Sequence, residues 1–191
     1  MKSTLHRRDV VKALLSDRKD LLVVAGLGST AWDITAAGDS PLSFPLWGAM
    51  GHAAMIGLGL ALAQPQRRVL VVTGDGEMLM GLGALATIGV QQPANLSIVV
   101  IDNERYGETG MQATHTAHGI DLEAVARGCG LKVCPADVAS IRKAIHEGPG
   151  PHFAAVKVQA EKIPLVLPPR EGALLKARFR RALLGPGADS V

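Results

Sequence analysis

One stretch near the middle of the chain constrains the fold more than any other. An apolar run typical of a buried strand, Val69 to Thr73, ends in Gly74-Asp75-Gly76. A helical pattern follows from about Met78 to Val90, and a second apolar run, Leu96 to Ile101, ends in Asp102-Asn103. This order of elements predicts a β-α-β unit whose strands are parallel and are each followed by polar residues.

These polar residues are suited to binding a metal ion and a phosphate. Because a right-handed crossover brings the carboxyl ends of parallel strands to one crevice, Asp75 and Asn103 are expected to meet across it. Mg²⁺ favours such oxygen ligands and keeps its other positions for water and phosphate. Gly74 and Gly76 permit a tight turn, so backbone N–H groups at the helix start can approach a diphosphate. Glu77 would lie beside this anion, and its side chain is expected to turn away.

This pattern resembles the signature of the thiamine diphosphate (ThDP) enzymes, in which Gly-Asp-Gly is followed, after a helix and a strand, by a pair that is usually Asn-Asn. Here Asp102 stands in place of the first Asn. The resemblance implies that Asp75, Asn103 and the backbone carbonyl of Arg105 hold Mg²⁺, and that the Gly-Asp-Gly turn and Glu77 lie at the diphosphate. Without the second half of the motif, the first half would be an ordinary turn flanked by glycines.

Two further segments match the same family. Met50 stands where the family has the bulky apolar residue that wedges between the two cofactor rings, and Gly48 would offer its carbonyl to the pyrimidine amino group. Taken alone, Met50 would be a core residue. The glycine-rich turn Gly26 to Thr30 follows a predicted strand, and the resemblance puts Gly28 and Ser29 near the cofactor. This turn lacks the full spacing of a dinucleotide-binding motif, and an unrelated nucleotide-binding module would rest on it alone.

The polar segment after the second strand matches one branch of this family. Residues 106–114 read Tyr-Gly-Glu-Thr-Gly-Met-Gln-Ala-Thr, which resembles the YGxTGxQxT loop of the sulfopyruvate and phosphonopyruvate decarboxylases. The segment joins a core strand to the next helix and so is placed to cover the site, with Tyr106 and Gly107 at the cofactor. His115 and His118 have a spacing that could bind a metal on a helix, but their Thr and Gly neighbours indicate a loop. The roles of these residues and of His52 stay open.

The rest of the chain continues to alternate between helical and strand-like patterns. Further helices are expected at 7–16, 51–63, 121–128, 138–147 and 171–184, further strands at 21–25, 131–134 and 152–159, and a loop at 38–47. Asp121 and Asp137 are placed to cap two of these helices. The elements predict a doubly wound α/β fold, a mostly parallel sheet of about five or six strands with helices on both faces. We expect one ThDP diphosphate-binding domain, 1–191, in which the Pro-led segment 164–191 forms a basic C-terminal helix.

Composition and charge argue against several classes of function. The chain has 20 Lys and Arg against 17 Asp and Glu, and the excess gathers near both ends, including Arg7 and Arg8, where it indicates solvated helix faces or a partner contact. With 3% aromatic residues and no recognition motif, nucleic-acid binding is not expected. The longest apolar run, Ala53 to Ala63, is shorter than the about 20 residues that span a bilayer. Cys129 and Cys134 lack zinc spacing and the charged N-terminus lacks a signal-peptide pattern, so a cytoplasmic protein is expected.

ThDP enzymes use two α/β domains, and the resemblance covers only one of them. The other domain grips the pyrimidine and supplies the glutamate that starts catalysis. The glutamates near the motif belong to the diphosphate domain's own segments: Glu77, Glu104, Glu108 and Glu123. The resemblance therefore implies no catalytic residue in this chain and a separate pyrimidine-binding alpha subunit, in an α2β2 or larger assembly.

By this interpretation the chain is the beta subunit of a split ThDP- and Mg²⁺-dependent 2-oxo acid decarboxylase. The resemblance implies a short anionic small-molecule substrate, sulfopyruvate or phosphonopyruvate, which would give an aldehyde and CO₂. A carboligase subunit of the acetolactate type and a non-catalytic regulatory subunit of the same fold are the alternatives. The sequence leaves the 2-oxo acid and the identity of the partner open.

Overall fold

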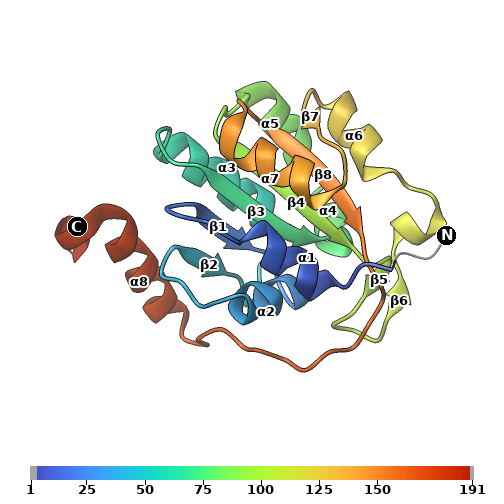
Figure 1. Ribbon diagram of the computed structural model, residues 1–191, viewed down its shortest axis with the longest axis horizontal. Coiled ribbons are helices and arrows are strands. Elements are labelled where there is room, and N and C mark those ends of the chain that lie inside the picture. Colours follow the sequence, from blue (N-terminus) through green and yellow to red (C-terminus); the bar gives the residue numbers. More distant parts are fainter. Residues whose placement is uncertain (1–3, 190–191) are drawn as a thin grey trace.

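A six-stranded parallel sheet forms the centre of the computed structural model, which describes residues 4–189 (Figure 1). The strands lie in the order β2-β1-β3-β4-β8-β7, and every pair of neighbours is parallel. Their bounds are β1 Leu22–Ala25, β2 Ser43–Pro45, β3 Val69–Gly74, β4 Leu96–Asp102, β7 Lys132–Val133 and β8 His152–Lys157. The prediction of a doubly wound α/β fold is confirmed.

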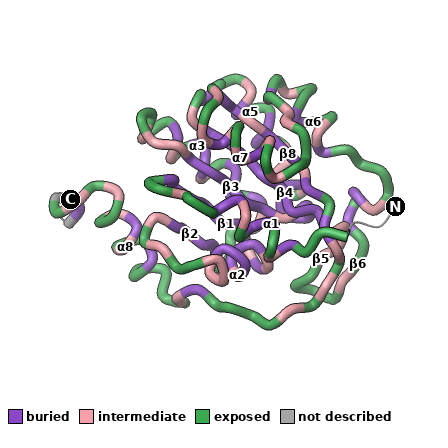
Figure 2. Tube along the Cα trace, viewed as in Figure 1, coloured by how far each residue is buried: buried purple, intermediate pink, exposed green. Residues whose placement is uncertain are grey.

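Helices cover both faces of the sheet because successive strand residues point to opposite sides. Seven helices flank it within the described residues: α1 Arg7–Leu14, α2 Ser29–Ala36, α3 Ala53–Ala63, α4 Asp75–Met80, α5 Ala84–Gln91, α6 Leu122–Gly128 and α7 Val138–Glu147. On one face, α1, α2 and α7 bury apolar side chains against Val23 and Val99. On the other, α3, α4, α5 and α6 pack against Val24 and Val100. Figure 2 shows the resulting buried sheet between helices whose outer sides are exposed.

One predicted helix is in fact two. The apolar pattern from Met78 to Val90 predicts a single helix, which is wrong because α4 ends at Met80 and α5 begins at Ala84. At Gly81, an added Cβ would lie 1.9 Å from the carbonyl oxygen of Gly51. The α4–α5 turn therefore packs directly on the backbone of the turn before α3. This tertiary contact interrupts the helix, and helical periodicity does not encode it.

The segment 38–47, predicted to be a loop, contains the edge strand β2. Ser43, Phe44 and Pro45 pair in parallel with residues 23–25 of β1. Pro41 and Pro45 hide this strand from pattern analysis, although an edge strand tolerates proline because one of its sides makes no ladder hydrogen bonds. The prediction of a loop was wrong for these three residues.

The C-terminal helix α8, Gly172–Leu184, is joined to the sheet by a long segment without helix or strand that runs along the outside of the domain (Figure 1). The helix packs on β2 through Phe179, whose ring centroid lies 5.4 Å from that of Phe44. Leu175 is also buried, whereas Leu174 remains 56% exposed. Part of the predicted apolar face thus contacts the domain. The short helix η2, Gly185–Asp189, follows.

The predicted polar segment after β4 folds into a small hairpin, β5 Arg105–Tyr106 and β6 Gln112–Ala113, followed by the 3₁₀ helix η1, His115–His118. Both predicted caps are confirmed: Asp121 accepts hydrogen bonds from two backbone N–H groups of α6, and Asp137 accepts one from α7. Across residues 4–189, no helix combines the length and apolar character that crossing a membrane requires.

Candidate cofactor site

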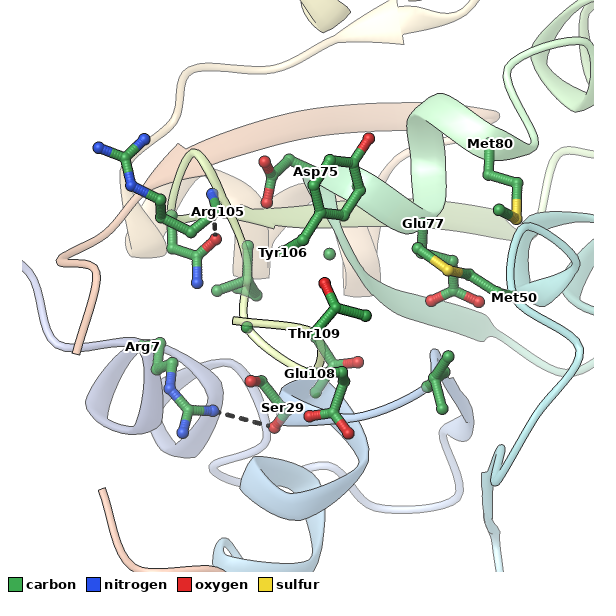
Figure 3. A pocket seen from close by; sticks show the side chains of 17 residues that line it. Arg7, Ser29, Met50, Asp75, Glu77, Met80, Arg105, Tyr106, Glu108 and Thr109 are labelled. Carbon is green, nitrogen blue, oxygen red and sulfur yellow. Dashed lines mark hydrogen bonds between the residues drawn. The ribbon is translucent and has the colours of Figure 1, made fainter. Parts of the chain in front are cut away.

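The predicted site lies at the carboxyl ends of the central strands. After β1 the chain continues into α2 on one face of the sheet, and after β3 it continues into α4 on the other. Such a switch point is where open α/β sheets bind their ligands. A cavity of about 370 Å³ opens there (Figure 3). Its lining consists of Arg7, Leu27, Ser29, Thr30, Met50, Gly74, Asp75, Gly76, Glu77, Met80, Ile101, Asn103, Arg105, Tyr106, Gly107, Glu108 and Thr109.

The three predicted metal ligands all line this cavity. Asp75 is the first residue of α4, directly after β3, and Asn103 directly follows β4. Because β3 and β4 are adjacent and parallel, both residues lie at the same end of the sheet. Asn103 Oδ1 accepts the backbone N–H of Arg105 at 2.9 Å, which orders the backbone just beyond β4. The structure thus brings Asp75, Asn103 and Arg105 to one pocket.

Two threonine hydroxyls hold Asp75, and the sequence analysis did not single them out. Asp75 Oδ2 accepts hydrogen bonds from Thr114 Oγ1 at 2.5 Å and from Thr116 Oγ1 at 3.3 Å. Asp75 is 1% exposed. Burial raises the pKa of its carboxyl to about 6 and the nearby Asp102 adds to the increase, whereas the hydrogen bond from Thr114 opposes it. The carboxylate is therefore mostly ionised at neutral pH and gains from a neighbouring cation.

Asp102, which replaces the first Asn of the motif, belongs to the same network. Thr116 Oγ1 donates to Asp102 Oδ1 at 2.8 Å, and Lys157 Nζ lies 2.9 Å from Asp102 Oδ2. Lys157 supplies the opposite charge that a second carboxylate needs so close to Asp75. The one sequence signal for the threonines was indirect, because Thr114 is the last residue of the YGxTGxQxT loop.

Glycines allow close backbone approach at two places around the cavity. Gly28, just before the lining residue Ser29, has φ +77°, a conformation that favours glycine, and it is the N-cap of α2. An added Cβ on Gly76 would lie 2.4 Å from the ring of Tyr106, so this ring packs directly on the first turn of α4. Gly48, predicted to bind the pyrimidine, is not among the lining residues.

Met50 and Glu77 lie at one end of the cavity, away from Arg7 and Arg105 (Figure 3). Glu77 is 5% exposed, and it accepts a hydrogen bond from Thr73 Oγ1 at 2.8 Å. Burial raises the pKa of this carboxyl, while Thr73 and backbone N–H groups on either side of the cavity oppose the increase. These amides belong to Leu27, Gly51 and Ala53. The hydrogen bond from Thr73 thus joins the first turn of α4 to the end of β3.

Arg7 is a cavity residue that the sequence interpretation missed. The basic residues near the N-terminus are expected on a solvated face or at a partner, but Arg7 is 3% exposed. Its Nη1 atom donates to Asp33 Oδ2 at 2.5 Å and to the Ser29 carbonyl at 3.1 Å. Arg8 Nε donates to the other oxygen of Asp33 at 3.1 Å. The interpretation was wrong for Arg7 because its buried counter-charge lies on another helix, α2.

The three histidines with open roles lie outside the cavity lining. His52 is exposed, and its Nδ1 atom lies 3.1 Å from the backbone carbonyl oxygen of Met50. His115 and His118 are exposed in η1. Between residues 4 and 189, no three His, Cys, Asp or Glu side chains gather into a metal site. The predicted metal donors in the cavity are of another kind: the carboxylate of Asp75, the side-chain amide oxygen of Asn103 and the backbone carbonyl of Arg105.

The fold and this cavity define a class of protein. Residues 29–158 match the family of thiamine pyrophosphate enzymes, C-terminal TPP binding domain. The chain therefore belongs to this family of ThDP enzymes, as the resemblance in the Gly-Asp-Gly motif implied.

Two relatives and one solved structure are informative. The chain is 43% identical over 156 residues to the sulfopyruvate decarboxylase subunit beta of Methanothermobacter thermautotrophicus, covering 81% of this chain and 83% of that one. It is 44% identical over 114 residues to the phosphonopyruvate decarboxylase of Streptomyces viridochromogenes, covering 60% of this chain and 28% of that one. The crystal structure of benzoylformate decarboxylase from Polynucleobacter necessarius shares the fold, with a TM-score of 0.66 at 19% identity over 85% of this chain and 34% of that one.

Proposed function

We propose that this chain is the diphosphate-binding beta subunit of a ThDP- and Mg²⁺-dependent 2-oxo acid decarboxylase. Its substrate would be a short 2-oxo acid with a second anionic group, sulfopyruvate or phosphonopyruvate, which gives an aldehyde and CO₂. The observation that carries the proposal is the convergence of Asp75, Asn103 and Arg105 at the switch point of the sheet. The substrate class is supported by the relatives named sulfopyruvate decarboxylase subunit beta and phosphonopyruvate decarboxylase.

The residues present fit a Mg²⁺–diphosphate group. Their oxygen donors are a carboxylate, an amide and a backbone carbonyl, which suit Mg²⁺ and leave positions for phosphate and water. Gly28 has a conformation that turns the backbone at the start of α2, and Gly76 has no Cβ in the first turn of α4, so N–H groups of both helix starts can face an anion. When bound, ThDP supplies the electron sink that accepts the electrons released with CO₂.

The residues at the metal and diphosphate end of the site then have definite tasks. Asp75, Asn103 and the carbonyl of Arg105 hold the metal, while Thr114 and Thr116 orient the carboxylate of Asp75. The diphosphate is held by backbone N–H groups from Gly28 and Ser29 and from Gly74 to Glu77. Tyr106 and Gly107 close that end of the cavity.

The remaining predicted residues shape the ring end of the site. Met50, which lines the cavity, would contact the cofactor rings. Gly48 lies outside the cavity lining, and its carbonyl would receive the pyrimidine amino group only as the family resemblance implies. Glu77 steadies the first turn of α4 through its hydrogen bond with Thr73. Because Met50 carries shape rather than charge, its contribution is to rate more than to affinity.

A separate alpha subunit would complete the site. The three cavity carboxyl groups have other tasks in this proposal: Asp75 holds metal, Glu77 binds Thr73, and Glu108 faces Gly28. The glutamate that activates the pyrimidine is therefore assigned to a partner. This division is supported by the alignment, which spans 83% of a relative named subunit beta but 28% of the phosphonopyruvate decarboxylase.

A surface for this partner adjoins the cofactor cavity. Met55 is 39% exposed and Met80 is 65% exposed, and together with Met50 they line a shallow hollow between α3 and α5. Exposed methionines in contact with a hollow are typical of protein interfaces. An α2β2 or larger assembly would bury them. We place this assembly in the cytoplasm, in agreement with the free thiols of Cys129 and Cys134.

Calorimetric titration of the chain with ThDP, NAD and ATP, each with and without Mg²⁺, tests the cofactor assignment. Of the three ligands, we expect only ThDP to bind, and only in the presence of Mg²⁺. Asp75→Ala should abolish this binding while the fold persists. Unchanged ThDP affinity in Asp75→Ala would sink the metal assignment. Binding of NAD or ATP in place of ThDP would favour a nucleotide-binding module.

A further inference from the structure

Two arginines share one buried carboxylate at the edge of the cofactor cavity. Arg7 and Arg8 both pair with Asp33, whose side chain is 1% exposed, so the cluster carries one excess positive charge. Both side-chain hydrogen bonds of Arg7 use Nη1, and its buried Nε atom has no hydrogen-bond partner in the described part of the chain. Burying a charged group with unused donors is costly unless an anion completes its environment.

Glu108, at the tip of the β5–β6 hairpin, is an acidic residue that lines the same cavity as Arg7. Its carboxyl group lies 3.0 Å from the position that a Cβ on Gly28 would take, at the N-terminus of α2. Burial raises the pKa of the Glu108 carboxyl, and the positive charge of Arg7 opposes this increase. Figure 3 shows Arg7, Ser29 and Glu108 on the same side of the cavity. The Glu108 carboxylate thus occupies the turn that was predicted from the sequence to hold an anion.

We propose that Arg7 is an anion-binding residue of this site, and that the Glu108 carboxylate occupies the anion position beside Gly28 in the ligand-free chain and is displaced when the diphosphate group of the cofactor binds. The inference deepens the proposed function and rests on it, because it names residues that act on the same ligand. Arg7 lies outside the family match, which begins at Ser29.

The chemistry favours exchange of one anion for another. A guanidinium and the N–H groups of a helix start suit phosphate oxygens better than a single carboxylate, because phosphate offers more oxygens and more charge. Asp33 and the Ser29 carbonyl fix Arg7 in place before the ligand arrives, so little side-chain entropy remains to be lost. Glu108 is exposed on a hairpin with two-residue strands, so its withdrawal requires little unfolding.

This exchange couples cofactor binding to the hairpin. When phosphate oxygens replace the Glu108 carboxylate, the hairpin tip loses its contact with the turn at Gly28. Tyr106 and Gly107 belong to the same hairpin segment and line the cavity. Because the Glu108 contact competes with the ligand, any change that weakens this contact strengthens diphosphate binding, by at most the factor by which the contact had opposed it.

Titration of the full chain with inorganic pyrophosphate in the presence of Mg²⁺ measures this competition directly by calorimetry. Glu108→Gln should bind pyrophosphate severalfold more tightly than wild type, because the competing charge is gone. Arg7→Gln should bind it about tenfold or more weakly, the loss expected for one charge-assisted hydrogen bond. The control Glu147→Gln removes the same charge from an exposed position on α7 and should leave the pyrophosphate affinity unchanged.

Parallel titrations with ThDP and thiamine locate the effect on the ligand. Both variants should shift ThDP affinity in the same direction as pyrophosphate affinity and leave thiamine binding unchanged. A shift for ThDP without one for pyrophosphate would overturn the proposal, because it would assign Arg7 and Glu108 to the ring end. Equal or weaker pyrophosphate binding by Glu108→Gln would overturn the competition between Glu108 and the diphosphate.

Further measurements distinguish a failure of this proposal from a folding defect of a variant and from a failure of the proposed function. Should Arg7→Gln fail to fold, Arg7→Lys keeps the charge without the planar fork, and unchanged pyrophosphate affinity in that variant would count against the role of Arg7. A wild-type chain that binds neither pyrophosphate nor ThDP would contradict the proposed function itself. Tight binding by wild type with no change in either variant would contradict this inference alone.

Discussion

Replacing Asp75 by asparagine should stabilise the ligand-free chain at neutral pH while it removes Mg²⁺-dependent binding of ThDP. The folded pKa of this carboxyl is about 6, against 3.8 for an unperturbed aspartate, chiefly because Asp75 is buried. Each pKa unit corresponds to about 1.4 kcal/mol, so the ionised carboxylate costs the folded chain about 3 kcal/mol. Asparagine keeps an oxygen to accept the hydroxyl of Thr114, but its amide N–H₂ needs acceptors, so we expect a net gain of about 1–3 kcal/mol.

The sign of the pH dependence follows from the raised pKa of Asp75. Between pH 3.8 and about 6 the folded chain binds more protons at this residue than the unfolded chain does. The free energy of unfolding of wild type therefore falls as pH rises through this window and levels off above it. Asparagine does not titrate, so the advantage of Asp75→Asn should grow from pH 4 to pH 6 and then stay constant.

Urea denaturation of both chains at a series of pH values, with a chelator to remove Mg²⁺, measures this difference. Asp20→Asn is a suitable control, because that aspartate side chain is 77% exposed and its removal should have a small, nearly pH-independent effect. The reasoning would be refuted if Asp75→Asn were less stable than wild type at pH 8, or if the difference between them did not change from pH 4 to pH 7.

Three other substitutions test separate parts of the structure. Gly81→Ala should lower the free energy of unfolding, measured by thermal melts, by more than about 2 kcal/mol, because its Cβ would lie 1.9 Å from the carbonyl oxygen of Gly51. The control Gly83→Ala, whose added Cβ would meet nothing within 4 Å, should leave the melts unchanged. Asp121→Ala should cost about 1 kcal/mol through loss of the α6 cap, and no change in melting temperature would count against the cap. Met50→Ala should keep ThDP affinity in calorimetry and lose turnover in the assembled enzyme; a loss of affinity instead would assign Met50 to binding.

The elements and the metal-binding end of the site could be predicted from the sequence because both depend on local patterns. An apolar run followed by a polar residue is read directly from the chain, and parallel pairing then brings Asp75 and Asn103 to one end of the sheet. The edge strand β2 could not be read in this way, because Pro41 and Pro45 remove the usual strand pattern. The break between α4 and α5 was also missed, because both helices bury apolar residues on the same face of the sheet.

The residues that the sequence analysis missed depend on contacts between distant segments. Arg7 is buried because Asp33, 26 residues away on α2, provides its counter-charge. Thr114 reaches Asp75 across a separation of 39 residues. Neither pair follows from spacing along a single helix or strand. From the sequence, Arg7 was therefore assigned to a solvated helix face or a partner contact, and Thr114 to a loop that covers the site. The fold decides which of these polar residues face the cavity.

The central claim is that this chain is one half of a split ThDP decarboxylase. The most direct test purifies the tagged chain from its native cells and measures CO₂ release from sulfopyruvate and phosphonopyruvate, with ThDP and Mg²⁺, for the co-purified complex and for the chain alone. We expect the complex to contain a pyrimidine-binding partner in stoichiometric amount and to release CO₂, and the chain alone to be inactive. A chain that decarboxylates either substrate by itself, or a complex that binds ThDP and releases no CO₂ from either, would contradict the claim.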